Sequence, residues 1–75
     1  MQLIFLSQDD RFNIRPTTER IAKYPAGAFS TTGVFPVYAL RVDGEGEDAV
    51  SRLLVPGADG GLYWVPMDEC HIVRR

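Results

Sequence analysis

The chain of 75 residues contains one cysteine, Cys70, and one histidine, His71. A lone cysteine forms no disulfide within the chain, which is typical of proteins in a reducing compartment. The two residues are adjacent, so in a strand their side chains point to opposite faces and do not hold one metal ion together. Zinc sites need several such ligands. The sequence therefore predicts no metal site.

Long hydrophobic runs are absent as well. The apolar run at residues 3–6 is followed directly by polar residues and has no basic leader before it. A membrane-spanning helix needs about 20 apolar residues, and a signal peptide needs a charged start and a small-residue cleavage site. We therefore expect a cytoplasmic protein that has no contact with the membrane.

A recognisable set of reactive side chains is missing too. The thiol has no base on its own side of the strand, because the histidine points to the other side. The acidic turn at residues 43–48 alternates carboxylates like a calcium loop, but it has Asp48 where that loop needs glycine and Leu54 where it needs glutamate. The glycine-rich tract at residues 57–61 joins two strands instead of opening a helix, so it is not a phosphate loop. We predict no catalytic, cofactor-binding or metal-binding residues and no enzyme activity.

Length and charge set further limits. A chain of 75 residues forms a single domain, residues 1–75, and one of this size buries only about 60% of the surface that its unfolded form exposes. The net charge is −2, with five basic and three acidic residues in positions 1–42 and three basic and seven acidic residues in positions 43–75. The core must be small, and no strong overall charge selects a partner.

The C-terminal third predicts a run of short strands. Residues 52–56 and 62–66 are apolar and separated by the glycine-rich turn, which is typical of a hairpin. Residues 67–69 are a short link, and residues 70–73 form a last strand. This segment places the protein in the mainly β class.

The first half supplies further strands. Residues 3–6 predict a strand that is buried on both faces or lies at the bottom of a small barrel, because all four side chains are apolar. Residues 12–15 alternate apolar and polar side chains, and residues 34–42 are the strongest strand in the chain. Residues 25–33 are rich in glycine, serine and threonine and are expected to form a loop.

The segment at residues 17–24 is ambiguous. Thr17 is a suitable helix cap, and Ile21 and Tyr24 are spaced as on one helical face. A helix this short is marginal on its own. We favour a strand or irregular structure here, with one short helical turn as the alternative.

The order of strand, proline, single 3₁₀ turn and closing strand in residues 61–73 resembles the end of an SH3-like barrel. The resemblance implies a small, partly open barrel of about five antiparallel strands. It does not extend to binding of proline-rich peptides. Peptide-binding SH3 domains have an Ala-Leu-Tyr-Asp-Tyr stretch and a tryptophan pair, whereas this chain has Leu-Ile-Phe-Leu at its first strand and Trp64 alone.

Aromatic residues give the one positive indication of a site. Leu62 and Trp64 face one side of their strand, and Tyr63 and Val65 face the other. A small barrel has only one interior, so one of the two sides is expected to remain exposed as a contact surface. The alternative is that residues 17–33 fold over the outer side and bury it.

We therefore expect a non-enzymatic interaction module that docks on a larger protein or on a second copy of itself, forming a homodimer. Small accessory or inhibitor proteins of bacteria, phages and plasmids have this size and composition. The predicted partner-binding residues are Tyr63, Trp64, Tyr24, Phe29, Tyr38 and Arg41.

The alternative function is binding of single-stranded nucleic acid. Small barrels stack bases on aromatic side chains beside basic ones, and five basic residues could line such a path. The net charge of −2 argues against it, because affinity for phosphate backbones depends on positive charge. The basic residues in question are Arg11, Arg15, Arg20, Lys23 and Arg41.

Overall fold

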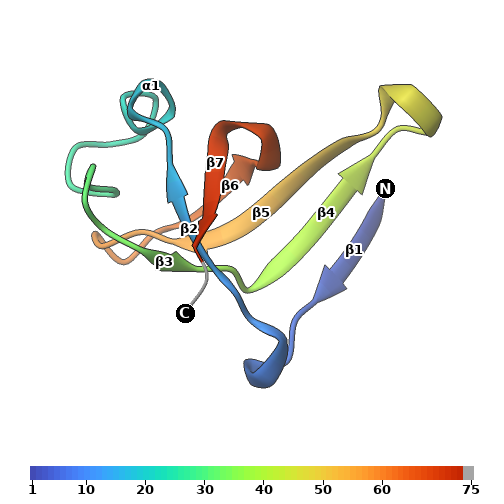
Figure 1. The fold of residues 1–75 in the computed structure, drawn as a ribbon, viewed down its shortest axis with the longest axis horizontal. Helices are drawn as coiled ribbons and strands as arrows, with labels where there is room; N and C mark the ends of the chain where they lie inside the picture. The colour runs from blue at the N-terminus through green and yellow to red at the C-terminus, as the bar shows by residue number, and fades with distance from the viewer. Residues whose placement is uncertain (74–75) are drawn as a thin grey trace.

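Two antiparallel sheets make up the computed structural model, which describes residues 1–73 (Figure 1). The first has the strand order β1-β4-β5-β6, with β1 (Gln2–Phe5), β4 (Ala39–Asp43), β5 (Val50–Pro56) and β6 (Leu62–Pro66). The second has the order β3-β2-β7, with β3 (Phe35–Pro36), β2 (Asn13–Pro16) and β7 (Cys70–Val73). Single helical turns connect the strands: η1 (Gln8–Asp10), α1 (Thr18–Ile21), η2 (Gly46–Asp48) and η3 (Met67–Glu69). The prediction of a mainly β fold is confirmed.

The core lies between the sheets and is built from alternate side chains of the strands. In β5, Leu53 and Val55 are fully buried, whereas Leu54 between them is partly exposed. This alternation follows from the two-residue period of a strand. Buried side chains from the other strands complete the cluster: Ile14, Phe35 and Val65, with Ala28, Phe29 and Val37 from connecting segments.

The predicted C-terminal strands and link agree with β6, η3 and β7, and β5 begins two residues earlier than predicted. The single strand predicted at residues 34–42 is wrong, because the chain there passes from one sheet to the other. Val37 donates a backbone hydrogen bond of 2.9 Å to Phe12, and Tyr38 donates one of 2.8 Å to Leu54 in β5. Pro36 ends β3, since proline has no N–H to continue the ladder.

The preference for a strand or irregular structure at residues 17–24 is also wrong. The helical alternative forms as α1, and the Arg20 N–H donates a hydrogen bond of 3.2 Å to the Thr17 hydroxyl. Such caps stabilise a helix by about 1 kcal/mol. Ile21 and Tyr24 also pack against the core, and this tertiary packing outweighs the weak helical tendency of so short a segment.

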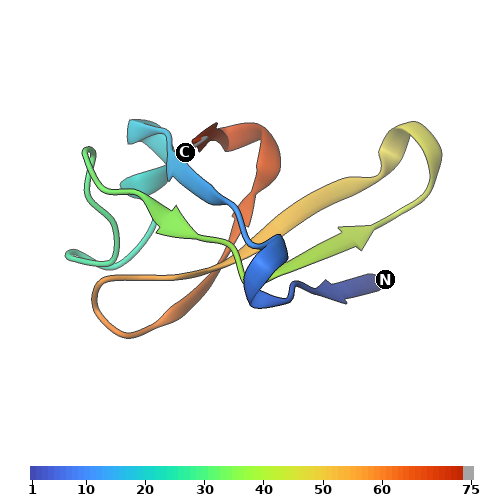
Figure 2. The same ribbon diagram turned by 60° about the horizontal axis from the view of Figure 1, so that its bottom comes forward.

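Strand β1 has the predicted place in the sequence but not the predicted burial. Leu3, Ile4 and Phe5 are 41%, 42% and 72% exposed. β1 is an edge strand paired only with β4, on a part of the sheet that extends to one side, away from β2, β3 and β7 (Figures 1 and 2). In this chain, apolar side chains on both faces therefore belong to an exposed edge strand and not to a buried one.

Truncation of Leu53 tests the position of the core. We expect Leu53→Ala to lower the free energy of unfolding by about 2–4 kcal/mol, because it leaves a cavity between the sheets. The matched control is Leu62→Ala, since Leu62 is 60% exposed, and its effect should stay within about 0.5 kcal/mol. Urea denaturation followed by circular dichroism measures both. Equal losses in the two variants would contradict the proposed core.

Candidate interaction surface

The side of the four-stranded sheet that faces away from the core carries a row of apolar side chains. Phe5, Ala39, Leu54 and Trp64 are directly opposite one another on the successive strands β1, β4, β5 and β6. Directly opposed residues of antiparallel strands point to the same face. We call these four residues the outer row. It crosses the whole sheet.

Three of the four residues of the outer row are at least partly exposed to solvent. Phe5 is 72% exposed. Leu54 and Trp64 are partly exposed, and neither belongs to the core cluster or to the side chains packed against it. Only the small Ala39 is fully covered. The alternative that residues 17–33 bury this side is wrong.

A charged group borders the outer row. Arg41 and Arg52 are directly opposite each other on β4 and β5, an arrangement that like charges alone would destabilise. The Asp43 carboxylate lies between them, with its Oδ2 2.8 Å from Arg41 Nε and 3.1 Å from Arg52 Nη1. The Arg41 guanidinium also lies 5.7 Å from the centre of the Trp64 ring, within the range of a cation–π contact. Arg41 Nε is buried and forms no hydrogen bond, so the carboxylate holds this arginine beside the tryptophan through charge alone.

Neutralising Asp43 tests this arrangement. Asp43→Asn should lower the free energy of unfolding by about 0.5–1 kcal/mol, because two arginines then face each other without an anion between them. The loss should shrink in high salt, which screens the repulsion. Urea titrations at low and high salt measure it. Asp48→Asn is the control, since Asp48 forms no ion pair within the described residues, and a loss as large in that variant would contradict the role of Asp43.

Three of the other predicted aromatic residues, Tyr24, Phe29 and Tyr63, belong to an internal cluster. Tyr24, Phe29 and Tyr63 meet edge to face, with ring centres 5.0–5.5 Å apart, and Phe35 lies 4.9 Å from Phe29. Such contacts add to the stability that burial alone provides. Phe29 is only 7% exposed. Its prediction as an accessible partner-binding residue is wrong, because it holds residues 17–33 against the core.

Tyr63 is held by the glycine-rich turn. A Cβ atom on Gly57 would lie 2.8 Å from the Tyr63 ring, and one on Gly61 would lie 2.9 Å from it, so both positions require glycine. The Tyr63 hydroxyl donates a hydrogen bond to the Asp59 carboxylate. This hydrogen bond lowers the pKa of Asp59 and raises the pKa of Tyr63. The turn is therefore a support for one aromatic ring.

The predicted site residues thus fall into separate groups. Trp64 and Arg41 lie together on the outer side of the sheet. Tyr24 and Tyr63 line the internal cluster, and Tyr38 lies apart under the guanidinium of Arg11, 4.5 Å from its ring centre. Leu54 is among the residues that the strand alternation predicts to be partly exposed, whereas sequence reasoning misses Phe5. The apolar run at residues 3–6 is the available signal for Phe5, but its pattern predicts a buried strand.

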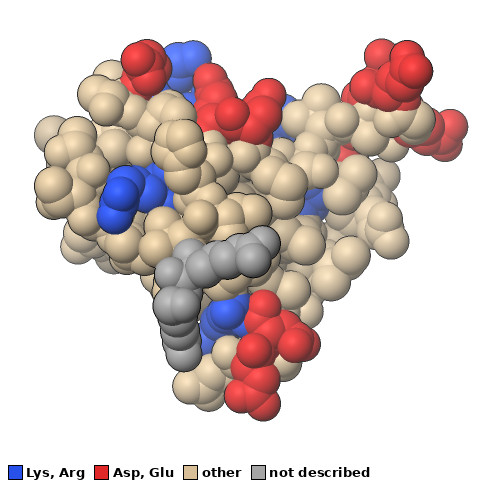
Figure 3. Space-filling view, in the orientation of Figure 1, with Lys and Arg blue, Asp and Glu red and all other residues tan. Residues whose placement is uncertain are grey.

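Several of the basic residues proposed for nucleic-acid binding contact side chains of their own chain. Arg20 donates hydrogen bonds to the Tyr24 hydroxyl at 3.0 Å and to Glu69 at 3.1 Å, and Arg41 is paired with Asp43. In Figure 3, acidic atoms gather around η1 and at the tip of the β4–β5 hairpin, near η2. These contacts argue against a basic path for a phosphate backbone.

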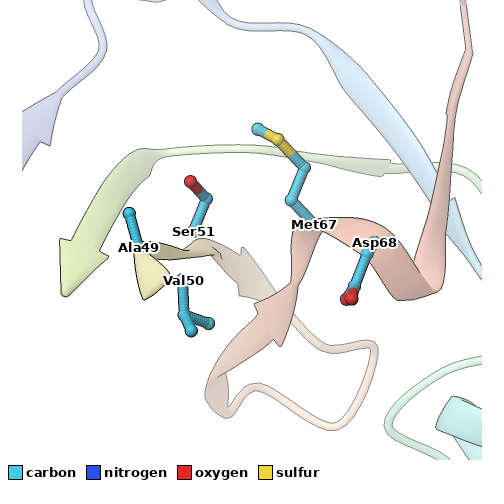
Figure 4. Close-up of a pocket in the computed structure, with 5 residues that line it drawn as sticks. All are labelled: Ala49, Val50, Ser51, Met67 and Asp68. Atoms are coloured by element: carbon cyan, nitrogen blue, oxygen red, sulfur yellow. The ribbon is translucent and has the colours of Figure 1, made fainter. Parts of the chain in front are cut away.

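A cavity of about 300 Å³ lies where the start of β5 approaches η3. It is lined by Ala49, Val50, Ser51, Met67 and Asp68 (Figure 4). β6 ends opposite Arg52, so the first residues of β5 pair only with β4. The lining offers one hydroxyl and one carboxylate, and it brings no base to a nucleophile.

Cys70 is half-buried and directly follows η3, and its thiol donates a hydrogen bond of 3.3 Å to the Met67 carbonyl. Burial, and then the nearby Asp68 carboxylate, raise the pKa of Cys70. A raised pKa favours the thiol over the reactive thiolate. The geometry is that of a packing residue.

Alkylation tests this description of Cys70. At about pH 8, iodoacetamide should modify the folded protein several-fold more slowly than a free cysteine peptide. Unfolding in urea should bring the rate close to the ordinary one, because it removes the burial that is the main cause of the raised pKa. Mass spectrometry over time measures the rates. Modification of the folded protein as fast as of the unfolded one would contradict the prediction.

Comparisons of the chain with protein-family models, curated proteins and solved structures give no match. Among residues 1–73, no three His, Cys, Asp or Glu side chains come together in a way that could hold a metal ion. None of the helices in this range is long and apolar enough to cross a membrane.

Proposed function

We propose that this protein is a non-enzymatic interaction module that docks on a larger protein through the outer row. The observation that carries the proposal is an apolar row that crosses all four strands, in which Phe5 is 72% exposed at one end and Leu54 and Trp64 are partly exposed. Aromatic residues and arginine dominate the energetics of protein interfaces. Both types occur here side by side.

The form of the surface favours a protein over a small ligand. Small-molecule sites are concave and enclose their ligand, whereas the outer row lies along the face of a sheet. The ion-paired group of Arg41, Asp43 and Arg52 corresponds to the polar rim that surrounds the apolar centre of an interface. A protein partner with an apolar ridge and an acidic margin fits this pattern.

The proposal extends to the class of protein. A domain of 75 residues whose main feature is one contact surface suits an accessory or inhibitor protein that acts on a larger partner, as small bacterial, phage and plasmid proteins do. The sequence of β6, η3 and β7, with Pro66 between strand and turn, supports the relationship to SH3-like barrels. Both statements rest on analogy of form.

Affinity capture from a cell extract tests the docking surface. Proteins retained by the unmodified chain should bind at least about tenfold more weakly to Phe5→Ala and to Trp64→Ala, because each variant removes an anchor from the outer row. Ile72→Ala is the matched control, since Ile72 is 56% exposed on β7 of the other sheet. Circular dichroism verifies that each variant is folded.

Comparison with the Ile72→Ala control separates loss of the docking surface from a general effect of substitution on capture. Retention of the same proteins at the same level by all variants would contradict docking through the outer row. Salt-sensitive capture of RNA or single-stranded DNA that is lost in Arg11→Ala would favour the nucleic-acid alternative instead.

A further inference from the structure

Strand β1 presents an unused row of backbone groups. It has one neighbour, β4. One position beyond the pair of Phe5 and Ala39, the Leu6 N–H donates a hydrogen bond of 2.9 Å to the Tyr38 carbonyl. In an antiparallel pair, the residues that direct their N–H and C=O toward the neighbour alternate with those that direct them away. Ile4 therefore points its backbone groups to β4, and Leu3 and Phe5 point theirs to the open side.

The other end of the same sheet is closed. The hydroxyl of Tyr24 donates a hydrogen bond of 2.8 Å to the Trp64 carbonyl on β6, and Pro66 in the same strand has no N–H to offer. In the second sheet, β3 contains only Phe35–Pro36. Short edges, proline and covering side chains are the usual protection of edge strands against pairing.

β1 lacks this protection. Among the edge strands of residues 1–73, it is the one whose large apolar side chains are exposed on both faces: Leu3 and Phe5 on the outer side and Ile4 on the other. Its four residues, Gln2–Phe5, carry no charge. An exposed, uncharged and apolar edge is suited to pairing with another strand.

We propose that β1 pairs with β1 of a second copy of this chain, antiparallel and around a two-fold axis at Ile4. Directly opposed residues of antiparallel strands share a face, so a two-fold axis must place one residue opposite itself. With Ile4 at the axis, Leu3 lies opposite Phe5 of the second copy, and both residues have their backbone groups on the open side. An axis at Leu3 would instead set Gln2 against Ile4 and bury a polar side chain.

The two-fold pairing also aligns the outer rows. The axis is perpendicular to the sheet, so the outer sides of both copies face the same way and the two rows form one continuous surface. The inference goes beyond the proposed function and does not rest on it, because backbone groups of the edge make the contact. Four residues bury far less than the about 800 Å² per partner of a stable interface, so the dimer dissociates on dilution.

Opposite charges at position 4 test the pairing and its register together. Ile4→Lys and Ile4→Glu should each dimerise at least about tenfold more weakly, because like charges then meet across the axis. An equimolar mixture of the two variants should regain dimerisation, because Lys then faces Glu. Analytical ultracentrifugation over a range of concentrations measures each sample. Ile72→Lys, a charge on an exposed residue of the β7 edge, should dimerise like the unmodified chain.

A second variant covers the case in which a charge at position 4 unfolds the protein. Leu3→Pro removes an N–H from the open side only and leaves the β1–β4 hydrogen bonds in place, so it should fold and be monomeric. The proposal is overturned by an unmodified chain that stays monomeric up to about 1 mM, by dimerisation of Leu3→Pro, or by a Lys–Glu mixture that remains monomeric. Loss of partner capture in Trp64→Ala leaves these measurements unchanged, so the two proposals fail separately.

Discussion

The single interior of this small domain depends on the alternation of buried and exposed side chains along β5. Leu53 and Val55 face the three-stranded sheet and are fully buried, and they are the centre on which strands from both halves of the chain pack. Because a strand has two faces, the same element must turn Leu54 to the other side. The described residues form two sheets and place no third layer on that side. The outer row is therefore a consequence of how the core is built.

The outer side is organised by charge as well as by apolar contact. Arg41 and Arg52 are opposed on neighbouring strands, and Asp43 bridges them. This leaves Arg41 fixed close to Trp64, so an aromatic ring and a guanidinium are held side by side before any partner binds. Ordering side chains in advance lowers the entropic cost of association. This order in the free protein is what the proposed docking surface requires.

Sequence reasoning succeeded where one local rule decided the outcome. A glycine precedes β6, and a proline is its last residue. Thr17 is recognisable as a helix cap in the sequence, although the sequence favours a strand or irregular structure after it. It failed where tertiary context decided. An apolar run such as residues 3–6 has the same pattern whether it is enclosed or lies at an edge, and only the strand order separates the two. Phe29 likewise looked like a loop residue, and its burial depends on Tyr63 from a distant segment.

The hydrogen bond from the Tyr24 hydroxyl to the Trp64 carbonyl affects how copies of this chain can assemble. A sheet that accepted strands at both ends could grow without limit, as in fibrils. In this sheet the β6 edge is blocked. Under the proposed pairing, the addition of one second copy at the β1 edge therefore leaves no free edge in the combined sheet. Under the proposed β1 pairing, the Tyr24 hydroxyl and Pro66 together limit association through this sheet to two copies.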